Sequence, residues 1–140
     1  DAWNKEIIGY GLSSRKGDIN TYFDGLNQVL DKIKEEQHDD LVTLHTDQGA
    51  VYSSRSFNNM HKDFLIKRSM SRAGTPTDNP VIESKNGWLK KEMHIDFDTT
   101  NYNTVQEFIE ELVRDNNYYR PCYALNYKTP VEYRVQLGFS

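Results

Sequence analysis

The order of two hydrophobic patterns most constrains the fold of this chain. Over residues 18–33 the apolar side chains recur at intervals of three and four, the spacing of one face of an α-helix. The next apolar run, Leu41–Leu44, is short and bounded by charge, which is typical of a buried strand. A short helix with Ser54 or Ser56 as its cap then precedes a further expected strand, Leu65–Met70. We therefore expect one helix, a strand, a short helix and another strand here.

The remaining segments predict one early strand and several late helices. Lys5–Ser13 is rich in β-branched and aromatic residues, as in a strand. Pro80 suits the first position of a helix that would run to about His94. Helices are also expected from Asn103 or Thr104 to about Tyr118 and from Thr129 onward, because Thr104 and Thr129 each open a capping-box pattern. With strands early and helices late, the predicted class is an α/β layered domain.

Length and composition exclude several classes of protein. The 140 residues suit a single domain, 1–140, and no apolar run approaches the roughly 18 residues that a membrane span requires. The only cysteine, Cys122, permits no internal disulfide and no cysteine-built zinc site, which fits a reducing, cytoplasmic compartment. A formal net charge of −4 excludes a uniformly basic surface. Any anionic partner must therefore be bound by a local patch.

One stretch of the chain has such a basic excess. Residues 61–91 contain seven basic and three acidic side chains, whereas residues 1–40 and 92–140 are both acidic. The basic residues of this window are Lys62, Lys67, Arg68, Arg72, Lys85, Lys90 and Lys91. They form either a solvated basic face or a binding site for an anion.

Two carboxylates stand beside this basic window. Asp47 directly follows the expected strand and opens an Asp-Gln-Gly turn, so it would be fixed by the sheet yet open to solvent. Glu83 lies in the first turn of the helix that begins at Pro80, after the loop Ser71–Asn79, which we expect to be the most mobile segment. Between the two acids lie 35 residues. Taken singly, Asp47 could be a plain turn residue and Glu83 a helix-dipole residue.

The sequence around these acids resembles the catalytic core of the retroviral-integrase-type transposases, whose signature is Asp, Asp, 35 residues, Glu. The matching text is LHTDQGAVYSS around Asp47, SMSRAGTPTDNPVIES around Glu83, and NGWLKKE after it. The similarity continues through Arg120-Pro121 and LNYKTPVEY. It implies a ribonuclease H-like mixed sheet flanked by helices. It also implies DNA transposition and integration by a metal-dependent polynucleotidyl transferase, with DNA and further copies of the chain as partners.

The resemblance also implies a set of site residues. Asp47 and Glu83 would hold Mg²⁺ or Mn²⁺, because hard oxygen ligands suit these ions, and two ions would bind the attacking and leaving oxygens. Glu83, Asn86 and Lys90 are spaced to share one helix face, and the family gives a lysine at this spacing a DNA contact. Further candidates for DNA binding are Lys85, Lys91 and Arg72. The neighbouring stripe of Ile82, Leu89 and Met93 is expected to anchor the helix to the core.

One acidic residue of the family signature is not assigned. The family carries its first Asp on the opening strand, whereas DAWNKEIIGYGLS resembles the end of the second strand and the third strand. Asp1 would therefore match a position after the first catalytic acid. We expect this chain to lack the first strands, to be inactive alone, and to expose strand edges that favour oligomerisation. The alternative is an inactive transposase-derived remnant that binds DNA or protein.

Two further features permit two interpretations each. His45, beside the candidate site, would either tune the carboxylate or be held at the strand end by local hydrogen bonds. A group of tyrosines near Arg120 would either stack on bases or pack as part of a helix end, and its members are Tyr118, Tyr119 and Tyr123.

Overall fold

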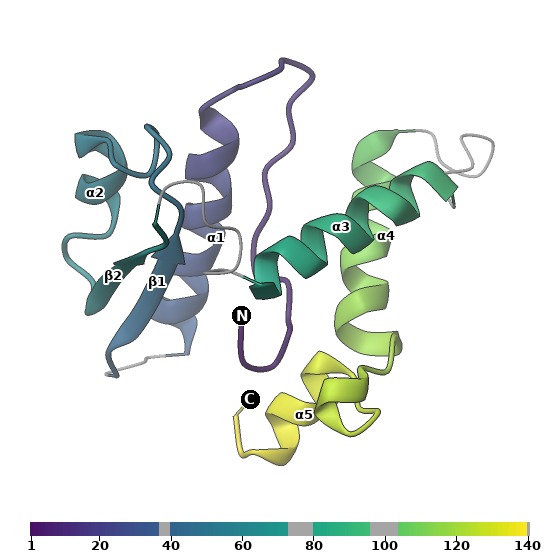
Figure 1. Ribbon diagram of the computed structural model, residues 1–140. Coiled ribbons are helices and arrows are strands. Elements are labelled where there is room, and N and C mark those ends of the chain that lie inside the picture. Colours follow the sequence, from purple (N-terminus) through teal and green to yellow (C-terminus); the bar gives the residue numbers. More distant parts are fainter. Residues whose placement is uncertain (37–39, 73–79, 96–103, 140) are drawn as a thin grey trace. The chain divides into compact units, whose positions relative to one another are not determined.

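The computed structural model describes residues 1–36, 40–72, 80–95 and 104–139, with residues 81 and 93–95 described by their backbone alone (Figure 1). In chain order the elements are α1 (Asn20–Glu35), β1 (Val42–Thr46), α2 (Arg55–Met60), β2 (Ile66–Met70), α3 (Pro80–Ile95), α4 (Val105–Arg114), the π-helical turn η2 (Asp115–Tyr119), the 3₁₀ turn η3 (Tyr123–Leu125) and α5 (Pro130–Gln136). Within these described ranges, no helix has the length and apolar character needed to cross a membrane.

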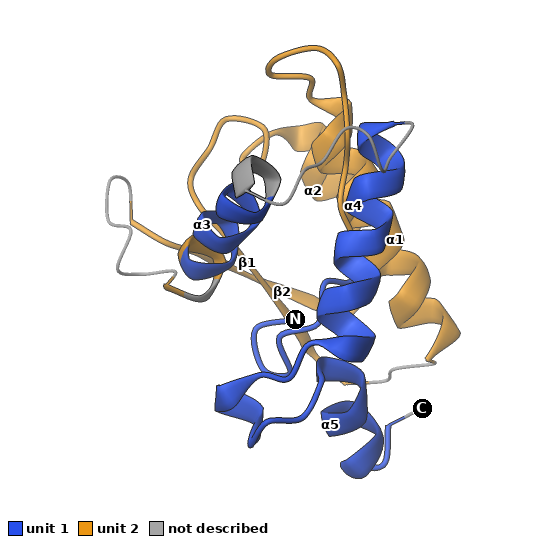
Figure 2. Cartoon of the chain, turned by 90° about the vertical axis from the view of Figure 1, so that its right-hand side faces the viewer, with its two compact units in different colours: residues 1–8, 84–140 blue, residues 9–83 orange. Residues whose placement is uncertain are grey.

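The chain divides into two compact units, which Figure 2 shows in different colours. One of them, the sheet unit, consists of residues 9–83 and carries β1 and β2. The other, the helical unit, combines residues 1–8 with residues 84–140. Each unit has its own buried side chains, and each is described by itself below. The expectation of a single domain over residues 1–140 stays a prediction.

The sheet unit confirms the predicted helix-strand-helix-strand order. Its two strands are parallel, with Val42 paired to Ile66 and Thr46 to Met70 at the ends of the ladder. Ser54 caps α2 by accepting a hydrogen bond from the N–H of Phe57 at 3.2 Å, as the sequence predicted for one of two serines. The core consists of buried Leu26, Leu30 and Phe57 with partly buried Phe23, Ile33, Leu44, Val51, Tyr52, Met60, Phe64 and Ile66 around them. Helices and strands of this unit thus share one apolar core.

The predicted strand Lys5–Ser13 is wrong, because no part of it joins a strand ladder in the described structure. Its second half lies against α1 instead: a Cβ on Gly11 would come within 2.2 Å of the Thr21 carbonyl oxygen, and one on Gly9 within 2.5 Å of the Gly25 carbonyl oxygen. A strand with side chains at these positions could not approach the helix so closely. The two glycines therefore permit packing of backbone against backbone.

The helical unit begins α4 and α5 with the two predicted capping boxes. Thr104 accepts from the N–H of Glu107 at 3.1 Å, and Thr129 accepts from that of Glu132 at 3.2 Å. The helix expected to reach Tyr118 ends in the wider turn η2, where the N–H of the following arginine bonds five residues back. The buried apolar side chains of this unit are Phe108, Ile109, Leu112, Leu125 and Pro130. The sequence thus placed both helix starts correctly.

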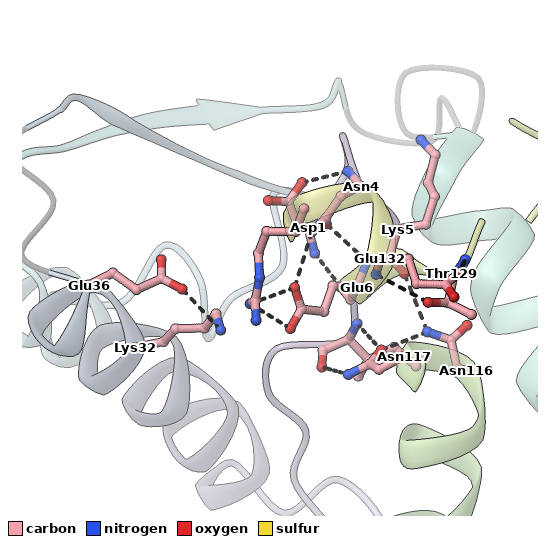
Figure 3. Close-up of polar contacts among 12 residues, drawn as sticks. Asp1, Asn4, Lys5, Glu6, Lys32, Glu36, Asn116, Asn117, Thr129 and Glu132 are labelled. Carbon is pink, nitrogen blue, oxygen red and sulfur yellow. Dashed lines mark hydrogen bonds and ion pairs between the residues drawn. The ribbon is translucent and has the colours of Figure 1, made fainter. Parts of the chain in front are cut away.

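A polar cluster fixes the N-terminal segment within the helical unit (Figure 3). The carboxylate of Glu6, which is 8% exposed, receives two hydrogen bonds from Arg134 at 3.0 and 2.9 Å and one from the Asn4 amide at 3.1 Å. Asp1 is used locally, since its carboxylate accepts from the N–H of Trp3 at 2.6 Å and of Asn4 at 3.2 Å. The first eight residues are therefore held by polar contacts and not by a sheet.

Candidate active site

Asp47 lies where the sequence placed it, directly after the last residue of β1 and exposed to solvent. Its Oδ1 accepts a hydrogen bond from the N–H of Gly49 at 2.7 Å, which closes the predicted Asp-Gln-Gly turn. A Cβ on Gly49 would lie 2.8 Å from that oxygen, so a side chain there would have to displace the carboxylate. The carboxylate is thus held at one oxygen, and the described residues give Oδ2 no donor.

The loop that carries Asp47 is bound by a side chain from β2. The Nη2 atom of Arg68 donates to the hydroxyl of Thr46 at 3.0 Å and to the carbonyl of Tyr52 at 3.2 Å. These two residues lie on either side of the loop 47–51. The Thr46 hydroxyl in turn donates to the carbonyl of Asp47 at 2.9 Å. A guanidinium suits this task because its fork of donors has fixed geometry.

The same guanidinium also contacts α2. Its Nη1 atom donates to the side-chain Oδ1 of Asn58 at 2.8 Å and approaches Nε2 of His61 at 3.4 Å. The guanidinium carbon lies 5.2 Å from the centre of the Phe57 ring. Burial lowers the pKa of Arg68, though an arginine stays charged at any physiological pH. The sequence counted Arg68 among the basic window as a candidate anion contact. Only its place on β2, facing α2, reveals an internal role.

His45 is held by a local hydrogen bond. Its Nδ1 atom lies 2.9 Å from the hydroxyl of Ser69, the residue paired with it across the two strands. Its Nε2 atom is buried without a partner among the described residues. The contact with Ser69 therefore agrees with the second interpretation, in which local hydrogen bonds hold His45 at the strand end.

Glu83 is exposed in the first turn of α3, as predicted. From Ser84 onward the helix belongs to the helical unit, where a different stripe holds it. Trp88 donates from its indole N–H to Glu92 at 2.9 Å, and Glu92 pairs with Arg120 at 3.0 Å. The guanidinium of Arg120 also lies over the Trp88 ring, 4.7 Å from its centre. About one helical turn before Trp88, the ammonium group of Lys85 donates a hydrogen bond to Oδ1 of Asn116. The stripe of Lys85, Trp88 and Glu92, hereafter the docking stripe, therefore anchors α3.

This anchoring corrects one prediction and has a geometric consequence. Of the three residues predicted to anchor the helix, Ile82 is 50% exposed, so the prediction is wrong there, Leu89 is partly buried, and Met93 lies outside the described side chains. At 3.6 residues per turn, the docking stripe is about 160° around the helix from the stripe of Glu83, Asn86 and Lys90. The docking stripe can anchor the helix because its groups pair with one another and with Asn116 and Arg120. The face that carries Glu83 is thus directed away from the contacts that hold the helix.

The expected DNA-binding residues fall into two groups. Asn86, Lys90, Lys91 and Arg72 are exposed. Lys85 is partly buried, bonded to Asn116 and 5.2 Å from the centre of the Trp88 ring, and burial lowers its pKa. Its ammonium group is therefore committed to the interior of the helical unit. Asp47, Arg72 and Glu83 belong to the sheet unit, and the other candidates to the helical unit. Residues 73–79, which make up most of the loop before α3, lie outside the described residues.

The tyrosines near Arg120 lie on the surface. Tyr118, Tyr119 and Tyr123 are 55%, 64% and 80% exposed. Arg114 lies over the Tyr119 ring, 5.7 Å from its centre. Arg120 itself is paired with Asp115 at 2.9 Å and with Glu92, and these carboxylates raise its pKa. Surface packing describes what is seen, and base stacking stays a prediction.

The carboxylates supply the donor chemistry that Mg²⁺ and Mn²⁺ prefer. Asp47 and Glu83 are both exposed, and each offers hard oxygen ligands. Among the described side chains, no three acidic, histidine or cysteine residues gather closely enough to form a metal site. The two acids thus fit such an ion by chemistry, as part of a larger set of ligands.

The chain is similar in sequence to proteins of known class. Residues 65–130 match the family model of the integrase core domain. The chain is 35% identical over 136 residues to InsK, a transposase of insertion sequence element IS150 from Escherichia coli K12, covering 97% of this chain and 47% of that protein. It is 31% identical over 136 residues to the transposase of element IS904 from Lactococcus lactis, covering 95% and 51%. This chain is therefore a homologue of insertion-sequence transposases with an integrase core domain. It spans about half the length of the curated relatives that it matches.

A solved structure supports the fold. A chain in the cryo-EM structure of the simian T-cell lymphotropic virus intasome, in complex with the PP2A regulatory subunit B56 gamma, superposes with a TM-score of 0.61 and 18% identity. The match covers 79% of this chain and 37% of the other. It agrees with the predicted α/β class and its ribonuclease H-like fold, in which helices flank a small sheet. The described part of that sheet is the parallel pair β1 and β2.

Proposed function

We propose that the protein containing this chain is a DNA transposase. In this proposal it is a polynucleotidyl transferase that cuts and rejoins phosphodiester bonds with divalent cations. The single observation that carries the proposal is the pair of exposed carboxylates, Asp47 and Glu83, at the family interval of 35 residues in a homologue of transposases. Carboxylates of this kind suit in-line phosphoryl chemistry, where charge on the phosphate must be neutralised.

Asp47 and Glu83 would hold Mg²⁺ or Mn²⁺ together with a further acidic ligand that is not assigned to a residue of this chain. When bound, the ions would neutralise charge on the scissile phosphate and make the attacking water or 3′-hydroxyl more acidic. The chain's own contribution is to position its ligands. The turn at Gly49 holds one Asp47 oxygen, and the docking stripe leaves the Glu83 face of α3 free for substrate.

Substrate binding is assigned to the exposed residues around Glu83. Asn86 and Lys90 share the helix face of Glu83, and Lys91 is exposed beside them. Arg72, at the end of the described part of the preceding segment, would add a further cation. Such side chains bind DNA chiefly through phosphates, without reading sequence. We further propose that the active form contains several copies of the chain, that the protein acts in the cytoplasm, and that residues 1–140 alone do not cut DNA.

The test is metal-dependent nicking of supercoiled plasmid DNA by the full-length protein. We expect nicking with Mn²⁺ that Asp47→Asn or Glu83→Gln abolishes. The matched control is Asp63→Asn, an exposed acid in the same unit, which should keep the activity of the unmodified protein. DNA binding without nicking under all metal conditions would contradict the proposal and favour the inactive remnant.

A further inference from the structure

Arg68 occupies an unusual position for a residue of the basic window. It lies on β2, partly buried, and all its hydrogen-bonding partners in the described structure are neutral: Thr46, Tyr52, Asn58 and His61. A buried cation is costly unless its donors are satisfied. The two terminal nitrogens of Arg68 make all four contacts, while Nε is buried without a partner among the described residues, so the guanidinium connects the end of β1, the following loop and α2.

The contacts lead directly to Asp47. Arg68 donates to the Thr46 hydroxyl at 3.0 Å, and that hydroxyl donates to the Asp47 carbonyl at 2.9 Å. A hydroxyl has one proton, so accepting from Arg68 directs its own proton toward Asp47. The same nitrogen of Arg68 holds the Tyr52 carbonyl at 3.2 Å, beyond the other end of the loop. The backbone of Asp47 is therefore fixed by a chain of two hydrogen bonds that starts at Arg68.

We infer that Arg68 is a positioning residue for the Asp47 carboxylate. It acts through Thr46 and makes no contact with metal or DNA in this role. The inference rests on the proposed function, because it assumes that Asp47 is a metal ligand. It also assigns to Arg68 a different role from that of the exposed cations. Outer-shell partners of metal ligands typically change metal affinity or activity by about 10- to 100-fold when they are removed.

Two variants of the full-length protein each remove one part of the connection from Arg68 through Thr46 to Asp47. Arg68→Lys keeps the charge but loses the fork that reaches both Thr46 and Tyr52, and Thr46→Val keeps the shape but loses the hydroxyl. We expect each to weaken Mn²⁺ binding, measured by calorimetry without DNA, by about tenfold or more. Because both act through one chain of bonds, the double variant should be no weaker than the worse single variant. Lys67→Gln, an exposed cation on the same strand, is the matched control and should bind Mn²⁺ as the unmodified protein does.

A second measurement keeps this inference separate from the proposed function. Amide hydrogen exchange at Gly49, whose N–H binds Asp47, should speed up about tenfold or more in both variants and stay unchanged in Lys67→Gln. Unchanged exchange at Gly49 would overturn the inference, as would Mn²⁺ affinity at the original level in Arg68→Lys and Thr46→Val. If the unmodified protein bound no Mn²⁺, the proposed metal site would be wrong, and the exchange rates alone would decide whether Arg68 fixes the loop.

Discussion

The side-chain amide of Asn117 brackets the backbone of Ile7. Its Oδ1 accepts from the Ile7 N–H at 2.9 Å, and its Nδ2 donates to the Ile7 carbonyl at 2.9 Å. These are the two bonds that a neighbouring strand would make to one residue. The side chain of Asn117 thus provides both hydrogen bonds that a neighbouring strand would give to Ile7. Asn117 is 6% exposed, so neither group of Ile7 has water as an easy substitute.

We expect Asn117→Ala to destabilise the helical unit by about 1–3 kcal/mol, because it removes the partners of the partly buried N–H and carbonyl of Ile7. Urea unfolding followed by circular dichroism measures the change. Asn27→Ala, an exposed position on α1, should cost less than about 0.5 kcal/mol. Equal losses in the two variants would show that the bracket contributes nothing specific.

The ion pair between Glu6 and Arg134 should contribute to the same unit. We expect Glu6→Ala to cost about 3 kcal/mol in the free energy of unfolding, since it leaves the largely buried Arg134 without that carboxylate. The exposed pair of Glu111 and Arg114 provides the comparison, and Glu111→Ala should cost less than about 1 kcal/mol. A double-mutant cycle with Arg134→Met isolates the coupling energy.

The stability of the sheet unit should depend on pH through His61. Burial, reinforced by the nearby charge of Arg68, lowers the pKa of His61 from its ordinary value of 6.5. Below about pH 6.5 the unfolded chain therefore binds a proton that the folded chain does not, so stability falls as pH falls. Above that pH the histidine is neutral in both states and adds no dependence. Urea midpoints at pH 7.5 and 5.5 should differ less in His61→Gln than in the unmodified protein.

Gly49 should be sensitive to the smallest side chain. A Cβ there would lie 2.8 Å from Oδ1 of Asp47, so Gly49→Ala must displace the carboxylate. We expect weaker Mn²⁺ binding with little loss of global stability, because the turn is exposed. Gly87→Ala is the control, since a Cβ at that position meets nothing within 4 Å and α3 should gain from the better helix former. Unaltered metal affinity in Gly49→Ala would show that the turn does not orient Asp47.

The lysines of α3 should differ in their effect on DNA binding. Lys90→Gln should lower the salt dependence of affinity by about one phosphate contact, because Lys90 is exposed on the Glu83 face. Lys85→Gln should leave that slope unchanged and reduce stability instead, since its ammonium binds Asn116. Fluorescence anisotropy with labelled duplex DNA at several salt concentrations measures both slopes. A reduced slope in Lys85→Gln would restore the role that the sequence predicted for it.

Local patterns predicted most of the elements correctly. The capping boxes at Thr104 and Thr129 and the cap at Ser54 depend on neighbouring residues alone, so their helix starts could be read directly. The position of Asp47 after β1 followed in the same way. Lys5–Ser13 failed because strand formation depends on a partner, and β-propensity reports only suitable side chains. Here Asn117, far along the chain, takes the place of that partner.

The positions of the two candidate acids were predictable, and those of the supporting residues less so. Asp47 after β1 and Glu83 in the first turn of α3 follow from motif and spacing, while their role as metal ligands stays a prediction. Arg68 and Lys85 looked like surface cations, because sequence composition does not distinguish a charge that is solvated from one that is bonded internally. The anchoring of α3 by the docking stripe was missed for a related reason. An indole and two charged groups show no apolar periodicity, although they satisfy one another.

The bond between Ile7 and Asn117 joins residues 110 positions apart, whereas Gly9 and Gly11 meet α1 within the next 20 residues. During synthesis from the N-terminus, residues 9–83 are complete while the partner of residue 7 has yet to be made. We therefore expect the sheet unit to fold early and the helical unit to close only when nearly the whole chain has emerged. Until then the first eight residues lack their contacts with Asn117 and Arg134, and a nascent chain stalled before Asn117 would have a folded sheet unit and an incomplete helical unit.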